Sequence, residues 1–65
     1  MFVSSSTMRR ILREAGATRV SDEACTELQK YVNRSAYRIA EKAVMLSKHA
    51  KRKTVAAADV RLACS

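Results

Sequence analysis

The sequence lacks most of the residues that interrupt or cross-link a chain. It has no proline, a single glycine, Gly16, and two cysteines, Cys25 and Cys64, with no CxxC motif or cysteine–histidine cluster near either. These cysteines offer neither a disulfide framework nor a zinc site. No uncharged stretch is longer than residues 1–8, which excludes a transmembrane helix, and no basic region precedes an apolar one as in a signal peptide. We therefore expect a soluble, reduced, intracellular protein.

Residues for catalysis are equally scarce. The chain has one histidine, no glycine-rich phosphate loop, no evident pair of acids for a pocket, and too short a length for a sizeable cleft. The two tyrosines, Tyr31 and Tyr37, are spaced too far apart on a helix to form one platform for stacking single-stranded bases. We expect neither an enzyme nor a bound cofactor or metal.

Positive charge, by contrast, is abundant. The 65 residues include 13 Lys and Arg against 6 Asp and Glu, which gives a formal net charge of +7. The hydrophobic content of 48% is too high for a disordered basic tail. A chain that folds and is strongly basic favours an acidic polymer as its partner.

The length of the chain limits its core. We expect one domain over residues 1–65, and at this size folding buries only about 60% of the surface that the unfolded chain exposes. Without a disulfide or a metal, such a monomer is marginally stable. Oligomerisation is therefore expected to complete the core.

Two short helices are expected near the ends of the chain. Over residues 5–15, serines and threonines offer N-caps, apolar side chains recur at helical spacing, and Gly16 suits the left-handed position after the helix. After the basic loop at residues 50–53, Thr54 is expected to cap a helix over residues 55–63. No segment predicts a strand, so the expected fold class is all-α.

The segment between them predicts one long helix. Ser21 can cap it, Asp22 and Glu23 suit its positive N-terminal dipole, and no breaker occurs over residues 22–48. At 1.5 Å per residue this helix is roughly 40 Å long, which exceeds the ~25 Å diameter of a compact domain of this size. Two short helices cannot cover its apolar stripe. We therefore expect a second copy of the long helix to cross the first in an obligatory dimer.

This order of helices, together with two separated motifs, resembles the histone fold. The first motif is Ala-Gly-Ala at residues 15–17 followed by Arg-Val-Ser-Asp at residues 19–22. The second is His-Ala-Lys-Arg-Lys-Thr-Val at residues 49–55, leading to Asp59. The resemblance covers residues 8–63 and is greatest to the tailless archaeal histones. The second motif also resembles the corresponding loop of the eukaryotic core histone numbered four.

The resemblance implies a handshake dimer, in which two chains pair head to tail, and a chain of such dimers that wraps double-stranded DNA. Each end of the dimer would place the first loop of one chain beside the second loop of the other, and the two first-helix N-termini would lie near the middle. Basic side chains and free helix N–H groups suit phosphate at each of these three places. A homodimer would carry 2 × (+7) = +14.

The resemblance also implies residue roles in DNA binding. The positions expected to contact DNA are Arg10, Arg13, Arg19, Lys51, Lys53 and Thr54. Arg19 would enter the narrowed minor groove, whose negative potential attracts guanidinium without demanding a base sequence. Lys51 stands where archaeal histones usually have glycine, so it adds a charge near DNA and removes backbone freedom. Arg9 is a weaker candidate for phosphate contact.

Other matching positions concern shape and assembly. Arg52 and Asp59 correspond to a salt bridge that holds the second loop. The dimer–dimer contact is expected at Leu46, His49, Asp59 and Leu62. Gly16 would allow close stacking of successive superhelical turns. Arg61 would face a base such as Lys30 and oppose that stacking, whereas Glu14 and Lys48 could pair across the turns and favour it.

The leading hypothesis is an architectural protein of the chromosome, in the cytoplasm, that bends and compacts duplex DNA as homodimers and as higher oligomers along it. The alternative within the same fold is a subunit that acts through a heterodimer, with a paralogue for example, in a transcription or repair complex. The high net charge favours direct wrapping. A basic amphipathic helix can also bind anionic membranes. Few large aromatic or leucine side chains are present for that role, so no membrane partner is expected.

Overall fold

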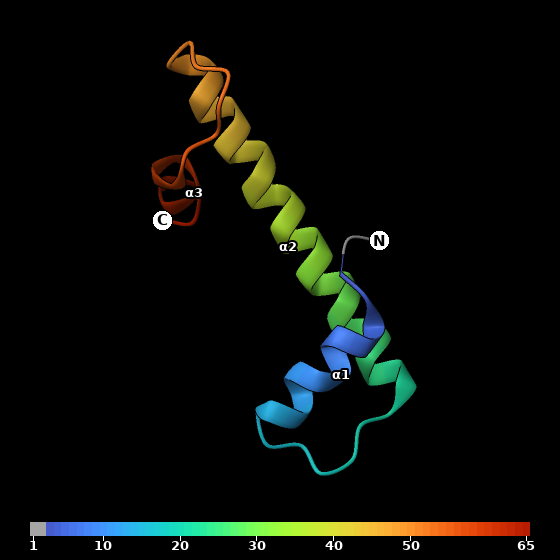
Figure 1. Cartoon of the computed structure of the whole chain (residues 1–65). Coiled ribbons are helices and arrows are strands. Elements are labelled where there is room, and N and C mark those ends of the chain that lie inside the picture. Colours follow the sequence, from blue (N-terminus) through green and yellow to red (C-terminus); the bar gives the residue numbers. More distant parts are fainter. Residues whose placement is uncertain (1–2) are drawn as a thin grey trace. The chain divides into compact units, whose positions relative to one another are not determined.

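The computed structural model describes residues 3–65, which form three helices and no strand. Helix α1 spans Ser5–Glu14, α2 spans Asp22–His49 and α3 spans Ala57–Ala63 (Figure 1). The predicted all-α order of short, long and short helices is confirmed. The chain divides into two compact units, Met1–Arg34 and Ser35–Ser65, and α2 contributes to both.

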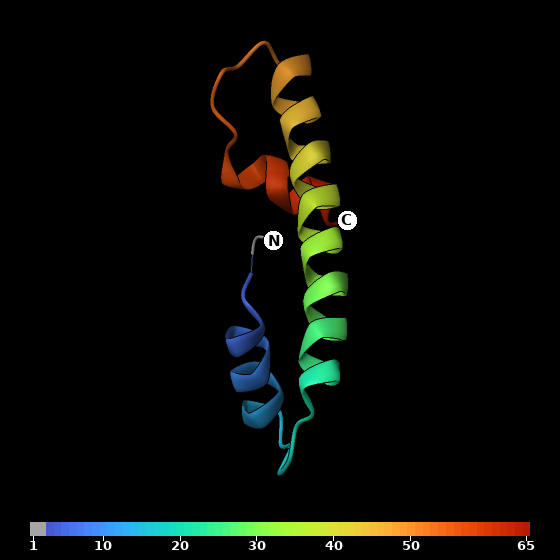
Figure 2. The ribbon, with the colours of Figure 1, turned by 90° about the vertical axis from the view of Figure 1, so that its right-hand side faces the viewer.

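In the first unit, α1 lies beside the first part of α2 (Figure 2). Its N-cap is Ser4, whose Oγ accepts a hydrogen bond from the N–H of Thr7 at 3.3 Å. Met8 of α1 and Cys25 of α2 are almost fully buried in this unit. Cys25 thus serves as a small apolar core residue, as a buried free thiol often does.

Val3, two residues before α1, is held on α2 by two side-chain amides. The N–H of Val3 donates to Oδ1 of Asn33 at 2.9 Å, and Nε2 of Gln29 donates to the carbonyl of Val3 at 2.6 Å. Gln29 and Asn33 are both buried and lie one turn apart on α2. Burial of these amides is compatible with stability because each has a hydrogen-bond partner.

The turn between α1 and α2 follows the predicted capping signals. The N–H of Gly16 donates to the carbonyl of Arg13, and the N–H of Ala17 donates to that of Leu12, both at 3.0 Å. This pair of bonds is the Schellman motif, and Gly16 has φ +116°, which confirms the left-handed position. Ser21 caps α2, since its Oγ accepts from the N–H of Ala24 at 3.1 Å.

In the second unit, α3 packs on the second part of α2 (Figure 2). Ala43 and Ser47 of α2 and Asp59 and Ala63 of α3 are buried there. The hydroxyl of Ser47 donates to the carbonyl of Val44 at 2.9 Å, so this buried polar group is satisfied within its own helix.

The prediction that Thr54 caps α3 is wrong. The N-cap position is Ala56, and its N–H donates to the carboxylate of Asp59 at 2.7 Å. An acid at the third position of a helix can satisfy the N-cap N–H in this way, which is one half of a capping box. Helix α3 therefore starts at Ala57 rather than at Val55.

Much apolar surface is left uncovered by either unit. Large apolar residues that are between 39% and 60% exposed include Ile11, Tyr31, Tyr37, Val44, Met45, Val55, Val60 and Leu62. The buried hydrophobic residues among those described are only Met8, Cys25, Ala43 and Ala63. Such a small core agrees with the limited burial expected for a chain of this length.

Candidate nucleic-acid interface

Three of the predicted DNA-binding arginines belong to the first unit, and all three are exposed. Arg10 and Arg13 extend from α1, and Arg19 lies in the first loop, which we define as residues 15–21. Arg10 is 81% exposed and lies 3.5 Å from the carboxylate of Glu14, one turn further along α1. An exposed pair at this distance is weak, so the Arg10 guanidinium remains available to a phosphate.

Arg9 is placed differently from these three. Its Nη1 donates to the carbonyl of Val20 at 2.8 Å, and its Nη2 donates to the carboxylate of Asp22. Its side chain is only 31% exposed. Arg9 therefore ties α1 to the end of the first loop and to the start of α2.

The remaining predicted contacts, Lys51, Lys53 and Thr54, all lie exposed in the second loop, which we define as residues 50–56. Lys51 has φ +58°, a left-handed conformation that is unusual for a residue with a side chain. The N–H of Lys51 donates to the carbonyl of Lys48, and the N–H of Arg52 to that of Ser47, both at 2.9 Å. Helix α2 thus ends in the same Schellman motif as α1, with lysine in the glycine position.

Arg52 and Asp59 form a two-pronged ion pair across the second loop. Nη2 of Arg52 lies 2.6 Å from Oδ1 of Asp59, and Nη1 lies 2.9 Å from Oδ2. The same Nη1 donates to the carbonyl of Thr54 at 3.1 Å. Because the planar guanidinium fits both carboxylate oxygens at once, this pair fixes direction as well as distance.

This pairing changes the acidity of Asp59. The hydrogen bond from Arg52, followed by that from the N–H of Ala56, lowers the pKa of Asp59 from 3.8 to about 2. The same hydrogen bond raises the pKa of Arg52. Both groups are therefore charged at neutral pH, and the ion pair between Arg52 and Asp59 holds the second loop there.

Three of the four predicted dimer–dimer positions line one hollow on the second unit. Leu46 and His49 of α2 and Leu62 of α3 surround an open space of about 420 Å³, together with neighbouring residues of the same helices. The fourth position, Asp59, is buried and bonded to Arg52 and Ala56 instead of lining the hollow.

Sequence reasoning missed the role of Arg9 and the amide anchor for Val3. From the sequence alone, an arginine on the outer face of an amphipathic helix cannot be assigned either to a bond with a neighbouring loop or to solvent. Its partner Asp22 lies 13 positions away, where no helical period relates the two. The spacing of Gln29 and Asn33 is a visible i, i+4 pair, but nothing in it identifies a backbone segment as the partner.

Neither a membrane span nor a metal cluster occurs among residues 3–65. No helix there combines the length and apolar character needed to cross a membrane. The same residues contain no group of three or more His, Cys, Asp or Glu side chains arranged to hold a metal ion.

The fold, with two motif-bearing loops between its three helices, is that of a histone. The sequence matches the family of the histone-like transcription factor (CBF/NF-Y) and archaeal histone over residues 1–64. The chain belongs to this family. It is 48% identical over 54 residues to an archaeal histone HAN1 subunit of Thermococcus zilligii, and 50% identical over 54 residues to probable archaeal histone 3 of Methanocaldococcus jannaschii. Each match covers 83% of this chain and 81% of the relative.

Proposed function

We propose that this chain is an architectural histone that binds duplex DNA with little sequence preference and bends and compacts it. The observation that carries the proposal is the exposure of five cations on α1 and the two loops. They are Arg10, Arg13, Arg19, Lys51 and Lys53. The similarity to two archaeal histones supports the same function.

The chemistry of these cations suits a phosphate backbone. Lysine and arginine side chains neutralise phosphate charge and release condensed counterions, which makes binding strong at low salt and independent of sequence. Thr54, whose carbonyl accepts from Arg52, adds a hydroxyl in the second loop. Neither a cofactor nor a metal takes part in this proposal, and we assign the protein no catalytic role.

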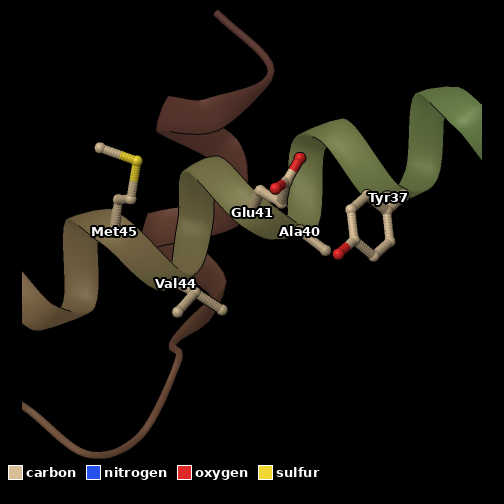
Figure 3. A pocket seen from close by; sticks show the side chains of 5 residues that line it. All are labelled: Tyr37, Ala40, Glu41, Val44 and Met45. Carbon is tan, nitrogen blue, oxygen red and sulfur yellow. The ribbon is translucent and has the colours of Figure 1, made fainter.

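The active form that we propose is a handshake dimer in which residues 1–65 form one domain. The exposed apolar residues of α2 support it. Tyr37, Ala40 and Val44 point toward one side of α2 and, with Glu41 and Met45, line a shallow hollow of about 390 Å³ (Figure 3). A second copy of α2 would cover apolar side chains that a single chain leaves in water.

The dimer is tested at Ile39, a half-buried apolar residue of α2. Ile39→Asp would place a charge in the proposed interface and should abolish folding and dimerisation together, because an unpaired buried charge is strongly unfavourable. Sedimentation of the wild type at micromolar concentration should show a dimer without DNA. A folded wild-type monomer would contradict the proposal.

DNA binding is tested by its dependence on salt. Each phosphate contact contributes about −0.9 to the slope of log K against log salt concentration. Arg10→Ala and Lys53→Ala should flatten this slope without changing sequence preference, as measured by titration of two unrelated duplexes at several salt concentrations. A change in preference larger than the change in slope would contradict phosphate contact.

We further propose that dimers associate along DNA through Leu46, His49, Asp59 and Leu62, and that Gly16 permits close stacking of successive turns. His49→Asp would set like charges across the contact and should leave folding and short-duplex binding intact. Nuclease digestion of complexes on long DNA should then lose the ladder of protected lengths that the wild type produces. An unchanged ladder would mean that dimers associate through another surface.

A second candidate is a subunit that acts through a heterodimer, since the matched family also includes histone-like transcription factors. The two functions differ in what the purified protein does alone. An architectural histone should retard duplex DNA by itself and, in cells, should be found on the chromosome. A heterodimer subunit should bind DNA only after a partner chain is added.

A further inference from the structure

Arg9 carries a cation on the same helix as Arg10 and Arg13, yet its surroundings differ from theirs. Two of its nitrogens are already used: Nη1 by the carbonyl of Val20, and Nη2 by the carboxylate of Asp22. Its side chain is 31% exposed, against 81% for Arg10. A guanidinium paired with a carboxylate and largely covered adds little attraction for phosphate.

The groups that Arg9 holds stand on either side of a bend in the chain. Val20 directly follows Arg19 in the first loop, and Asp22 is the first residue of α2. One planar side chain therefore fastens a loop carbonyl and the start of the next helix at the same time. A lysine ammonium lacks this rigid fork and cannot hold both acceptors in a defined direction.

The second loop contains the same arrangement. Arg52 donates to a loop carbonyl, that of Thr54, and to Asp59 in the first turn of α3. Each loop that carries proposed DNA contacts is thus fastened by an arginine that bonds one loop carbonyl and one acid at the start of the following helix. The repetition of this pattern in two unrelated stretches of sequence argues against an incidental surface contact for Arg9.

We propose that Arg9 is a positioning residue for DNA binding, which holds Val20 and Asp22 so that Arg19 meets the duplex from a loop that is already ordered. The inference rests on the proposed function. A loop ordered before binding loses less conformational freedom in the complex, and this raises affinity without a new contact. Asp22 is 91% exposed, so the ion pair is weak, and its effect on DNA affinity is limited to the free energy with which it orders the loop.

The decisive variant is Asp22→Asn, because positioning and direct phosphate contact predict opposite signs. If Arg9 contacted phosphate, removal of the competing carboxylate would free it and tighten binding. Under the proposal, Asp22→Asn weakens duplex binding roughly two- to fivefold, the most that loss of an exposed ion pair that orders the loop produces. Tighter or unchanged binding by Asp22→Asn would overturn the proposal.

Glu23→Gln is the matched control. It removes the same charge from the adjacent residue in the same helical turn, where Glu23 has no part in the brace. Loss of a negative charge near the DNA should leave binding unchanged or strengthen it by up to about twofold. If Glu23→Gln weakened binding as much as Asp22→Asn does, the effect would come from the loss of any negative charge in the first turn of α2, and the proposal would be wrong.

Arg9→Lys tests whether the planar, two-pronged guanidinium is needed or only its positive charge. It should weaken binding as much as Asp22→Asn, whereas retention of wild-type affinity would show that only a positive charge is needed and would overturn the proposal. Amide hydrogen exchange without DNA supplies an independent readout. The first-loop amides should exchange faster in Arg9→Lys and Asp22→Asn than in the wild type or Glu23→Gln, while circular dichroism shows all four folded.

The outcomes also distinguish this inference from the proposed function. A wild-type protein that fails to bind duplex DNA at low salt overturns the proposed function, and the role of Arg9 in DNA binding with it. If the wild type binds and the Asp22→Asn and Glu23→Gln variants have equal affinity, the positioning role of Arg9 is overturned and the proposed function is not.

Discussion

The two loops are built on one plan but are held by different means. Each follows a helix that ends in a Schellman motif, and each is braced by an arginine to an acid of the next helix. In the first loop, glycine occupies the left-handed position, and the acid, Asp22, is 91% exposed. In the second, Lys51 occupies that position, and the side chain of the acid, Asp59, is 6% exposed.

The difference shows how a loop can tolerate an unfavourable backbone conformation. A left-handed residue with a Cβ atom costs roughly 1–2 kcal/mol relative to the usual right-handed form. The bidentate pair of Arg52 with the buried carboxylate of Asp59 holds the second loop in shape despite that cost. The first loop, with Gly16, has no such cost and needs only a pair at the surface. The cation at Lys51 lies exposed in the same loop as Lys53, where the proposed function uses it.

The largest effect expected from this comparison concerns the two acids. Asp59→Asn should lower the thermal midpoint by roughly 10 °C or more, because it weakens a charge-assisted, two-pronged bond in a domain of this size. Asp22→Asn should lower it by less than about 2 °C, because exposed pairs contribute little. Calorimetry of both variants at neutral pH checks the prediction. Equal losses would mean that burial does not distinguish the two braces.

The brace at Asp59 should also fail in acid. Its pKa falls from 3.8 to about 2 on folding, so its ionised form stabilises the fold fully above pH 3.8 and loses that contribution as the pH falls through 2. The difference in thermal midpoint between wild type and Asp59→Asn should therefore stay constant from neutral pH to about pH 5 and close between about pH 4 and 2. Paired thermal scans at fixed ionic strength measure this. A difference that persists at pH 2 would assign the stabilisation to packing.

A smaller effect is expected at Gly16. Gly16→Ala should destabilise the protein by about 1 kcal/mol, because the new residue must hold a positive φ. A Cβ atom at this position meets nothing within 4 Å, so the whole cost comes from the backbone. Chemical denaturation of the wild type and the variant gives the difference. An unchanged stability would show that the turn relaxes to another conformation.

The smallest effect is the reverse change in the second loop. Lys51→Gly should stabilise the fold by about 0.5 kcal/mol, since relief of the left-handed strain exceeds the extra freedom that glycine gives the unfolded chain. Lys51→Ala is the matched control and should give no gain, because alanine keeps the strain. Denaturation curves of both variants test this, and equal gains in both would locate the effect in the charge of Lys51. Both variants should bind duplex DNA with a flatter salt slope.

Several features of the fold could be predicted from local sequence. The three helices, the cap at Ser21 and the left-handed Gly16 all follow from signals within a few residues of the feature itself. The start of α3 could not be predicted from the same signals, because Thr54 and Asp59 are both good capping residues and the sequence does not rank them. In the structure, Asp59 is held by Arg52 and takes the N–H of Ala56, so the helix begins later.

By itself, then, the sequence determined the all-α order, the family and the positive charge of the two loops. These depend on periodicity and on motifs, which are properties of neighbouring residues. Only the tertiary structure decided which cations stay exposed and which are used internally, as Arg10 and Arg9 show. The reason is physical: a guanidinium bonds to whichever acceptors fold within about 3 Å of it, and adjacency in space between α1 and Asp22 is not encoded in any spacing along the chain.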